Sequence, residues 1–226
     1  MARRQSASRS HQTRSPAGRE AAPAGKGSGT GELRIIGGDW RSRKLRFPDA
    51  GGVRPTPART RETLFNWLMF DVEGARCLDL FAGSGALGLE ALSRGARYVD
   101  FVDANKQVTQ SIRQHLQTLA CTRARVHHLP AQTWLKQQAE CAAEPYDLIF
   151  LDPPFHQDLL QPCLYLLEYG GFIGPNTKLY LEAESDFPPA QLPEHWRILK
   201  QKTAKNKIFL LLECPQPRTL QGKSVT

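Results

Sequence analysis

The sequence predicts an α/β fold built around a mainly parallel, seven-stranded sheet. From Arg76 onward, short apolar segments alternate with amphipathic helical segments, which is the pattern of parallel strands joined by right-handed helical crossovers. The last two segments, 195–204 and 206–213, have no helix between them. We expect them to form a hairpin that turns at Lys205 and Asn206 and places an antiparallel strand at or near one edge of the sheet.

A small β-hairpin and a helix are expected before this alternating region. Segments 33–36 and 44–47 predict two short strands around a Gly-Gly turn, and the glycine- and proline-rich residues 51–58 predict a loop. The helix that follows should bury one face, because its apolar residues have helical spacing: Leu64, Phe65, Trp67 and Leu68.

The alternating region supplies the remaining elements. Strands are expected at 76–81, 97–103, 124–129, 146–151 and 177–183. Helices are expected at 85–95, 105–119, 132–140 and 159–168. The chain then divides into a disordered basic tail (1–31), a basic hairpin and loop (32–61), the α/β domain (62–214) and a flexible C-terminal tail (215–226).

The positive charge is concentrated in the N-terminal quarter of the chain. The formal net charge is +8; residues 1–31 hold six basic residues and one acid, and residues 34–61 hold eight basic residues and two acids. Such asymmetry indicates a polyanionic partner, nucleic acid first among them. The alternative for residues 1–31 is a solvated tail that promotes solubility.

Composition predicts a cytoplasmic protein without a metal site. The five cysteines are scattered and form no C-x-x-C or His/Cys cluster with zinc spacing, which is typical of a reduced compartment. No apolar run approaches the roughly 20 residues that span a bilayer. We expect no membrane association and a monomer.

The segment "LDLFAGSGALGLE" contains G-x-G-x-x-G at Gly83, Gly85 and Gly88, between a predicted strand and a predicted helix. Asp103 ends the next strand, where a carboxylate can accept both hydroxyls of a ribose. These features fit NAD, and they fit any nucleoside ligand with a free ribose, including S-adenosylmethionine. A tight turn that binds no ligand is the remaining alternative.

Two further features favour S-adenosylmethionine. Asp79 lies four residues before Gly83, where a carboxylate would repel a pyrophosphate but attract a cationic sulfonium and α-amine. The "DPPF" segment, Asp152–Phe155, ends a strand at the same edge of the sheet. Its two prolines stiffen the turn and donate no N–H, which leaves the Asp152 carboxylate, the Pro153 carbonyl and the Phe155 ring to receive a planar aromatic amine.

The motifs together resemble a known family. "DLFAGSGALGLEALSRGA" with "DPPF" resembles class I S-adenosylmethionine-dependent methyltransferases, and "RIIGGDWRSRKL" with "RPTPARTRETLFNWL" is similar to the RsmD family of bacterial 16S rRNA guanine-N2 methyltransferases. The resemblance extends over about residues 33–213. It implies a Rossmann-like domain, S-adenosyl-L-methionine as cofactor, and methylation of a specific guanine, guanine 966, of the small ribosomal subunit's 16S rRNA.

The resemblance also implies roles for individual residues. The catalytic set is Asp152, Pro153, Pro154 and Phe155, which would hold the target guanine. The cofactor-binding set is Asp79, Phe81, Gly83, Ser84, Gly85, Asp103, Ala131, Gln132 and Asp152. Many class I enzymes have Asp or Asn before the adenine-binding residue, whereas this chain has Pro130; Gln132 or water would then bind the adenine amine.

Basic residues of the N-terminal quarter are the candidates for contact with RNA phosphates. They are Arg34, Arg41, Arg43, Lys44, Arg46, Arg54, Arg59 and Arg61. Trp40 would stack on a base or anchor the hairpin. Two other functions stay open: a DNA adenine-N6 methyltransferase, and a non-catalytic RNA-binding assembly factor with the same fold.

Overall fold

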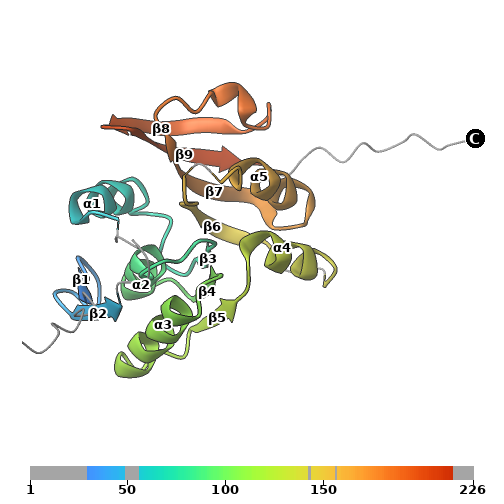
Figure 1. Cartoon of the computed structure of the whole chain (residues 1–226). Helices are drawn as coiled ribbons and strands as arrows, with labels where there is room; N and C mark the ends of the chain where they lie inside the picture. Colours follow the sequence, from blue (N-terminus) through green and yellow to red (C-terminus); the bar gives the residue numbers. More distant parts are fainter. Residues whose placement is uncertain (1–29, 49–55, 142–143, 156, 216–226) are drawn as a thin grey trace, which may run out of the picture.

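The predicted sheet is present in the computed structural model, which describes residues 30–48, 56–141, 144–155 and 157–215. Within them, seven strands form one sheet in the order β5-β4-β3-β6-β7-β9-β8 (Figure 1). Neighbours from β5 to β7 pair in parallel, and β9 runs antiparallel to both β7 and β8. These strands are β3 (Arg76–Asp79), β4 (Tyr98–Asp103), β5 (Ala124–His128), β6 (Tyr146–Leu151), β7 (Ile173–Glu184), β8 (Arg197–Ala204) and β9 (Lys207–Cys214).

Helices cover both faces of the sheet and bury two apolar clusters (Figure 1). One face carries α1 (Ala58–Trp67), α2 (Ala86–Ser93) and α3 (Lys106–Thr118). The other carries α4 (Ala131–Ala139) and α5 (Leu160–Tyr169). A 3-10 turn, η1 (Pro189–Gln191), precedes the final hairpin. The class of fold and its element order are therefore as the sequence predicts.

The N-terminal hairpin is a separate two-stranded sheet made of β1 (Thr30–Arg34) and β2 (Lys44–Pro48). Leu33, Leu45 and Phe47 lie in the same apolar cluster as α2 and α3, so the hairpin is packed on the main domain. The expected boundary at residue 62 is wrong, because it falls inside α1, and β1 begins two residues before residue 32. Most of the expected basic tail, and residues 216–226 of the C-terminal tail, lie outside the described residues.

Helix α2 lies close to the sheet at Gly88, the third glycine of the G-x-G-x-x-G motif. A Cβ atom on Gly88 would come within 2.2 Å of the Phe101 ring on β4. Such a distance is far inside van der Waals contact, so only glycine permits this approach. The close packing holds the turn that precedes α2 against the ends of β3 and β4.

Strand β7 is longer than the sequence predicts. It begins at Ile173 rather than Thr177, although Gly174 and Pro175 follow immediately. The register with β6 shifts between Tyr146 and Leu148, and the Thr177 hydroxyl bridges this irregularity by donating to the Tyr146 carbonyl at 2.6 Å. The irregular pairing accommodates residues that normally end a strand.

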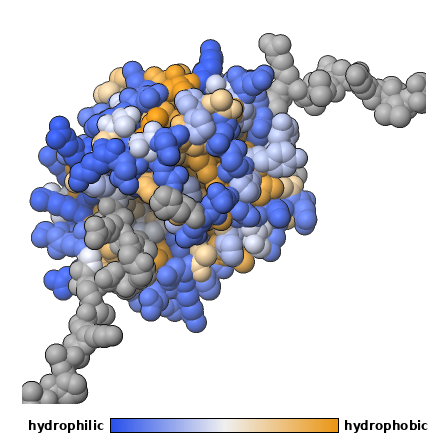
Figure 2. Space-filling model, turned by 45° about the horizontal axis from the view of Figure 1, so that its top comes forward, coloured by the Kyte–Doolittle hydropathy of each residue, from blue (hydrophilic) through white to orange (hydrophobic). Residues whose placement is uncertain are grey.

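The surface is mainly hydrophilic on the face shown in Figure 2, with hydrophobic residues gathered in a band from its top toward its centre. None of the described helices is long and apolar enough to cross a membrane. Among the described residues, no group of three His, Cys, Asp or Glu side chains is placed to hold a metal ion.

Candidate active site and nucleic-acid interface

A cavity of about 710 Å³ opens at the carboxyl ends of β3, β4 and β6, within the usual size range of small-molecule sites. This is where the strand order reverses, because β4 lies on one side of β3 and β6 on the other; open α/β sheets bind ligands at such a point. The cavity brings together most of the predicted site residues: Phe81, Gly83, Asp103, Ala131, Gln132, Asp152, Pro153, Pro154 and Phe155.

Asp103 and the glycine turn form one wall of the cavity. The Gly83 N–H donates to Asp103 Oδ2 at 2.9 Å, and the Asn105 N–H donates to Oδ1 at 2.7 Å. Burial raises the pKa of Asp103, while these two hydrogen bonds oppose the shift. The carboxylate is thus held rigidly with lone pairs still available, as an acceptor for a pair of hydroxyls requires.

Asp79 lies beneath the glycine turn rather than on the cavity wall. It is buried, and its Oδ2 accepts a hydrogen bond of 2.9 Å from the N–H of Gly88, in the first turn of α2. The residue before that helix is Gly85, in the left-handed region at φ 74°, which has no side chain to cap the helix. Asp79 therefore performs from β3 the capping normally done by a serine or aspartate. Ser84 and Gly85 are also outside the residues that line the cavity.

The environment of Asp79 changes its charge state. Burial raises its pKa to about 8, the Gly88 hydrogen bond opposes the shift, and the charges of Asp152 and Asp103 add to it. Asp79 is accordingly largely protonated at neutral pH. The attraction expected between Asp79 and a cationic ligand then requires proton release.

The first turn of α4 forms a second wall. Pro130, Ala131, Gln132 and Thr133 line the cavity, and Pro130 makes no side-chain cap. The backbone N–H groups of a first helical turn have no partner inside the helix. Ala131, predicted to meet a ring nitrogen, thus presents a donor at the cavity, and Gln132 lies beside it.

The Asp152–Phe155 turn closes the other side of the cavity, directly after β6. Side-chain exposure of Asp152 is 27%. Burial and then the Glu182 charge raise the pKa of Asp152 to about 7, and Lys207 counteracts them. The carboxyl is thus balanced between its two protonation states at neutral pH.

Lys207 is a site residue that the sequence did not reveal. Its Nζ lies 3.0 Å from Glu182 Oε2, 3.7 Å from Asp152 Oδ1 and 4.8 Å from the centre of the Phe155 ring. The pairing of β7 with β9 sets Lys207 opposite Glu184, at the carboxyl edge of the sheet. The predicted turn at Lys205 and Asn206 was the available signal, because a hairpin turning at that edge delivers its next residue to the site. Other cavity residues missed are Leu80, Ala104, Gln157 and Leu159.

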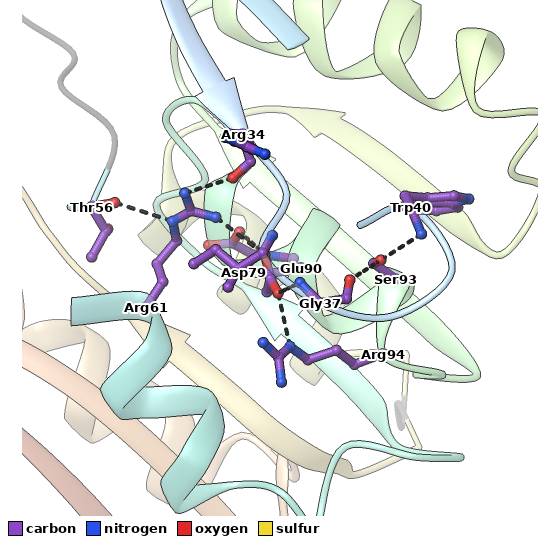
Figure 3. A network of polar contacts seen from close by, with 11 residues as sticks. Arg34, Gly37, Trp40, Thr56, Arg61, Asp79, Glu90, Ser93 and Arg94 are labelled. Atoms are coloured by element: carbon purple, nitrogen blue, oxygen red, sulfur yellow. Dashed lines mark hydrogen bonds and ion pairs between the residues drawn. The ribbon is translucent and has the colours of Figure 1, made fainter. Parts of the chain in front are cut away.

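The prediction that Arg61 contacts RNA is wrong. Arg61 is buried and lies 3.2 Å from Glu90, which is fully buried on α2 (Figure 3). Its Nε and Nη2 donate to the carbonyls of Thr56 and Arg34. The pKa of Arg61 is lowered by burial, against the raising effect of Glu90. The guanidinium thus joins the hairpin, α1 and α2 instead of facing solvent.

Six of the other predicted RNA-binding residues are exposed: Arg34, Arg41, Arg43, Lys44, Arg46 and Arg59. Lys44 forms an exposed ion pair with Glu32 at 3.0 Å. Arg54 lies outside the described residues. These exposed side chains give the hairpin and the start of α1 a positively charged surface that a polyanion can reach.

The turn of the hairpin lies at the end of α2 farthest from the glycine turn. The Trp40 N–H donates to the Ser93 hydroxyl at 2.9 Å (Figure 3). The Asp39 N–H donates to the Ser93 carbonyl at 2.8 Å. Ser93 ends α2, an eight-residue helix that spans about 12 Å. Trp40 is partly buried against the core, which favours anchoring over base stacking.

Comparisons with known proteins place this geometry in a family. The family model described as Conserved hypothetical protein 95 matches residues 33–213. The ribosomal RNA small subunit methyltransferase D of Escherichia coli is 42% identical over 87% of this chain and 96% of its own length. The protein of the same name from Haemophilus influenzae is 46% identical over 76% of this chain and 89% of its own length.

Solved structures agree with the sequence relatives. A structure described as the putative methyltransferase yhhF from Escherichia coli superposes with a TM-score of 0.75 at 38% identity, covering 83% of this chain and all of the other. A Thermus thermophilus 16S rRNA N2 G1207 methyltransferase, solved with AdoMet and guanosine, shares the fold at 24% identity and a TM-score of 0.62, over 86% of this chain and 53% of that one. The chain therefore belongs to the Conserved hypothetical protein 95 family, together with the ribosomal RNA small subunit methyltransferase D proteins.

Proposed function

We propose that this protein transfers a methyl group from S-adenosyl-L-methionine to the exocyclic N2 of a guanine in 16S rRNA, guanine 966 by the family resemblance. One observation carries the proposal: a single cavity joins the Gly83–Asp103 wall to the Asp152–Phe155 turn. The Gly83–Asp103 wall suits a nucleoside, and the Asp152–Phe155 turn suits an aromatic amine. The names of the relatives, ribosomal RNA small subunit methyltransferase D, support RNA as the substrate.

The donors and acceptors of the cavity fit the cofactor. Asp103 would accept from the ribose hydroxyls, and the Ala131 N–H would donate to an adenine ring nitrogen. Asp79, after releasing its proton, would place negative charge behind the methionine end, and Gly83, Ser84 and Gly85 would form the turn around that end. Pro130 offers the adenine amine no side-chain acceptor, so Gln132 or water would serve. When bound, S-adenosylmethionine supplies an electrophilic methyl group and leaves as a neutral thioether.

The Asp152–Phe155 turn would orient the target amine. Guanine N2 is a weak nucleophile because its lone pair is delocalised into the ring. Hydrogen bonds from its two N–H groups to the Asp152 carboxylate and the Pro153 carbonyl would favour a pyramidal nitrogen and aim its lone pair, while Phe155 would stack on the ring. Pro154 keeps the turn stiff. Positioning and electrostatics would supply most of the rate enhancement.

The proton would leave after the bond to carbon begins to form, since the amine becomes acidic only then. Asp152, with its pKa raised to about 7 by burial and by Glu182, can accept it and return it to solvent. The target base must leave its stack to reach the cavity. Arg34, Arg41, Arg43, Lys44, Arg46 and Arg59 would contact the surrounding phosphates.

The test is methylation of defined RNA. The protein is incubated with labelled S-adenosylmethionine and with small subunits or 16S rRNA from a strain that lacks the enzyme, and the digested RNA is analysed. We expect N2-methylguanosine at one position, and Asp152→Ala should abolish it while cofactor binding persists. N6-methyladenine in duplex DNA, or binding of RNA without any transfer, would instead support one of the two other functions.

A further inference from the structure

A buried polar chain connects the core of the sheet to the Asp152 carboxylate. The Tyr180 hydroxyl donates to Glu182 Oε1 at 3.0 Å, and Lys207 Nζ donates to Glu182 Oε2, also at 3.0 Å. Glu182 and Tyr180 are 1% exposed, so the carboxylate has no access to bulk water. The same ammonium reaches Asp152 Oδ1 at 3.7 Å. Two carboxylates from neighbouring strands thus share one cation.

The arrangement fixes the position of the ammonium. A lysine side chain is flexible and is strongly hydrated when free. Here the Lys207 ammonium is paired with Glu182. It also lies 4.8 Å from the centre of the Phe155 ring, within the range of a cation–π contact. Lys207 can therefore move little relative to the Asp152–Phe155 turn.

The Lys207 ammonium affects the ionisation of Asp152 because other groups around Asp152 are acidic. The negative charge of Glu182, on β7, acts on Asp152, and Tyr180 is hydrogen-bonded to Glu182. Asp79, on β3, also interacts electrostatically with Asp152. Within the described residues, Lys207 is the one cation in a salt bridge with Asp152. Without that cation, two carboxylates in a poorly solvated site would favour protonation of one of them. A protonated Asp152 keeps one oxygen occupied by its own proton and loses acceptor capacity.

We propose that Lys207 is a positioning residue for methyl transfer: anchored by Glu182, it holds Asp152 as an oriented carboxylate that accepts from the target amine. This inference rests on the proposed function. Lys207 acts through Asp152 and forms no bond to the methyl group. Glu182 has the opposite electrostatic effect, because its charge opposes ionisation of Asp152.

Opposite shifts in the pH dependence test the proposal. Single-turnover methyl transfer is measured from about pH 6 to pH 9.5 for the wild type, Lys207→Met and Glu182→Gln. Lys207→Met should shift the acidic limb of the pH–rate profile upward by about one pH unit. The rate of this variant should be about tenfold below the wild-type rate near pH 6.5 and should return to it near pH 9. Glu182→Gln should move the limb downward. Lys207→Arg should keep the wild-type profile, and Lys200→Met removes one exposed charge from the same hairpin as the matched control.

A second measurement is independent of activity. Carboxyl ¹³C NMR of aspartate-labelled protein follows the titration of Asp152 directly, with Asp152→Asn for assignment. The Asp152 midpoint should rise in Lys207→Met and fall in Glu182→Gln; unchanged midpoints, or an equal loss of rate at every pH, would overturn the role given to Lys207. If Lys207→Met does not fold, Lys207→Gln, which also removes the charge but keeps a polar head group beside Glu182, replaces it and should raise the same Asp152 midpoint. A wild type that methylates no RNA but shows both midpoint shifts would refute the proposed function and leave the Lys207–Asp152 coupling intact.

Discussion

Arg61 Nη1 lies 3.2 Å from Glu90 Oε2, and both side chains are shielded from solvent. Glu90 also accepts hydrogen bonds from the N–H groups of Ile36 and Gly37 at 2.9 and 2.8 Å and from Arg94 at 2.8 Å. One carboxylate thus ties α1, α2 and the N-terminal hairpin together (Figure 3). Such a fully bonded buried pair fixes how the hairpin sits, whatever its net contribution to stability.

Removing Arg61 should destabilise the protein. Arg61→Ala removes one of the two guanidinium groups that pair with the buried Glu90 carboxylate, while Arg94 keeps its contact. We expect the free energy of unfolding to fall by about 3 kcal/mol, the lower end of the range for breaking a buried ion pair. Urea denaturation measures the change. Arg59→Ala, which removes an exposed arginine from the same helix, should change it by about 0.5 kcal/mol or less. Equal effects of the two substitutions would show that the buried pair has no special role.

Cofactor affinity should rise with pH because of Asp79. Its pKa of about 8, raised by burial, must fall when a cation binds nearby, so binding releases a proton below that pH. Calorimetry should therefore show S-adenosylmethionine affinity increasing from about pH 6.5 to pH 8.5 and then levelling. Asp79→Asn, which keeps an acceptor for the Gly88 N–H, should remove the dependence. A dependence that survives in Asp79→Asn would assign the titration to another group.

Asp103 should recognise the ribose hydroxyls. Asp103→Asn should weaken S-adenosylmethionine binding by about 10- to 100-fold, the usual loss for a hydrogen bond to a charged group. The matched control is a cofactor analogue that lacks both ribose hydroxyls. That analogue should bind the variant and the wild type with nearly equal affinity; a full loss with both ligands would indicate that Asp103 only supports the glycine turn.

Gly88 should tolerate no side chain while Phe101 is present. Gly88→Ala places a methyl group where the ring lies 2.2 Å away, and we expect the free energy of unfolding to fall by about 1–3 kcal/mol. Phe101→Leu supplies the background that tests the cause. In that background, Gly88→Ala should cost clearly less, as urea denaturation would show; an undiminished cost would mean that the Phe101 ring is not responsible, because alanine itself has the higher helix propensity.

Local patterns in the sequence were enough to predict the sheet, the helices and most of the cavity wall. Gly83, Asp103 and Asp152 could be found because parallel strands end at one edge, so residues that follow strands converge there. Lys207 could not be found in the same way. Its contact with Asp152 depends on the register of β9 against β7, which is set by packing across the sheet rather than by neighbouring residues.

Arg61 was misjudged because a run of basic residues looks alike whether its members are exposed or buried. The useful signal was in another element: Glu90 lies in the otherwise apolar segment "ALGLEALS" of α2, and a buried acid needs a partner. Asp79 was placed correctly near the turn, but its hydrogen bond to Gly88 arises from the glycine cap of α2, which only the three-dimensional structure shows.

Strand β8 forms one edge of the seven-stranded sheet. One side of β8 pairs with β9, and the strand carries Arg197, Lys200 and Lys202 within eight residues that are almost all exposed. A strand of another chain that paired with the free edge of β8 would have to bring its backbone alongside these three cations. A second copy of β8 would bring three more. Charged edges of this kind discourage uncontrolled sheet extension. The β8–β9 hairpin should therefore resist self-association, and this resistance should weaken as rising salt screens the charges.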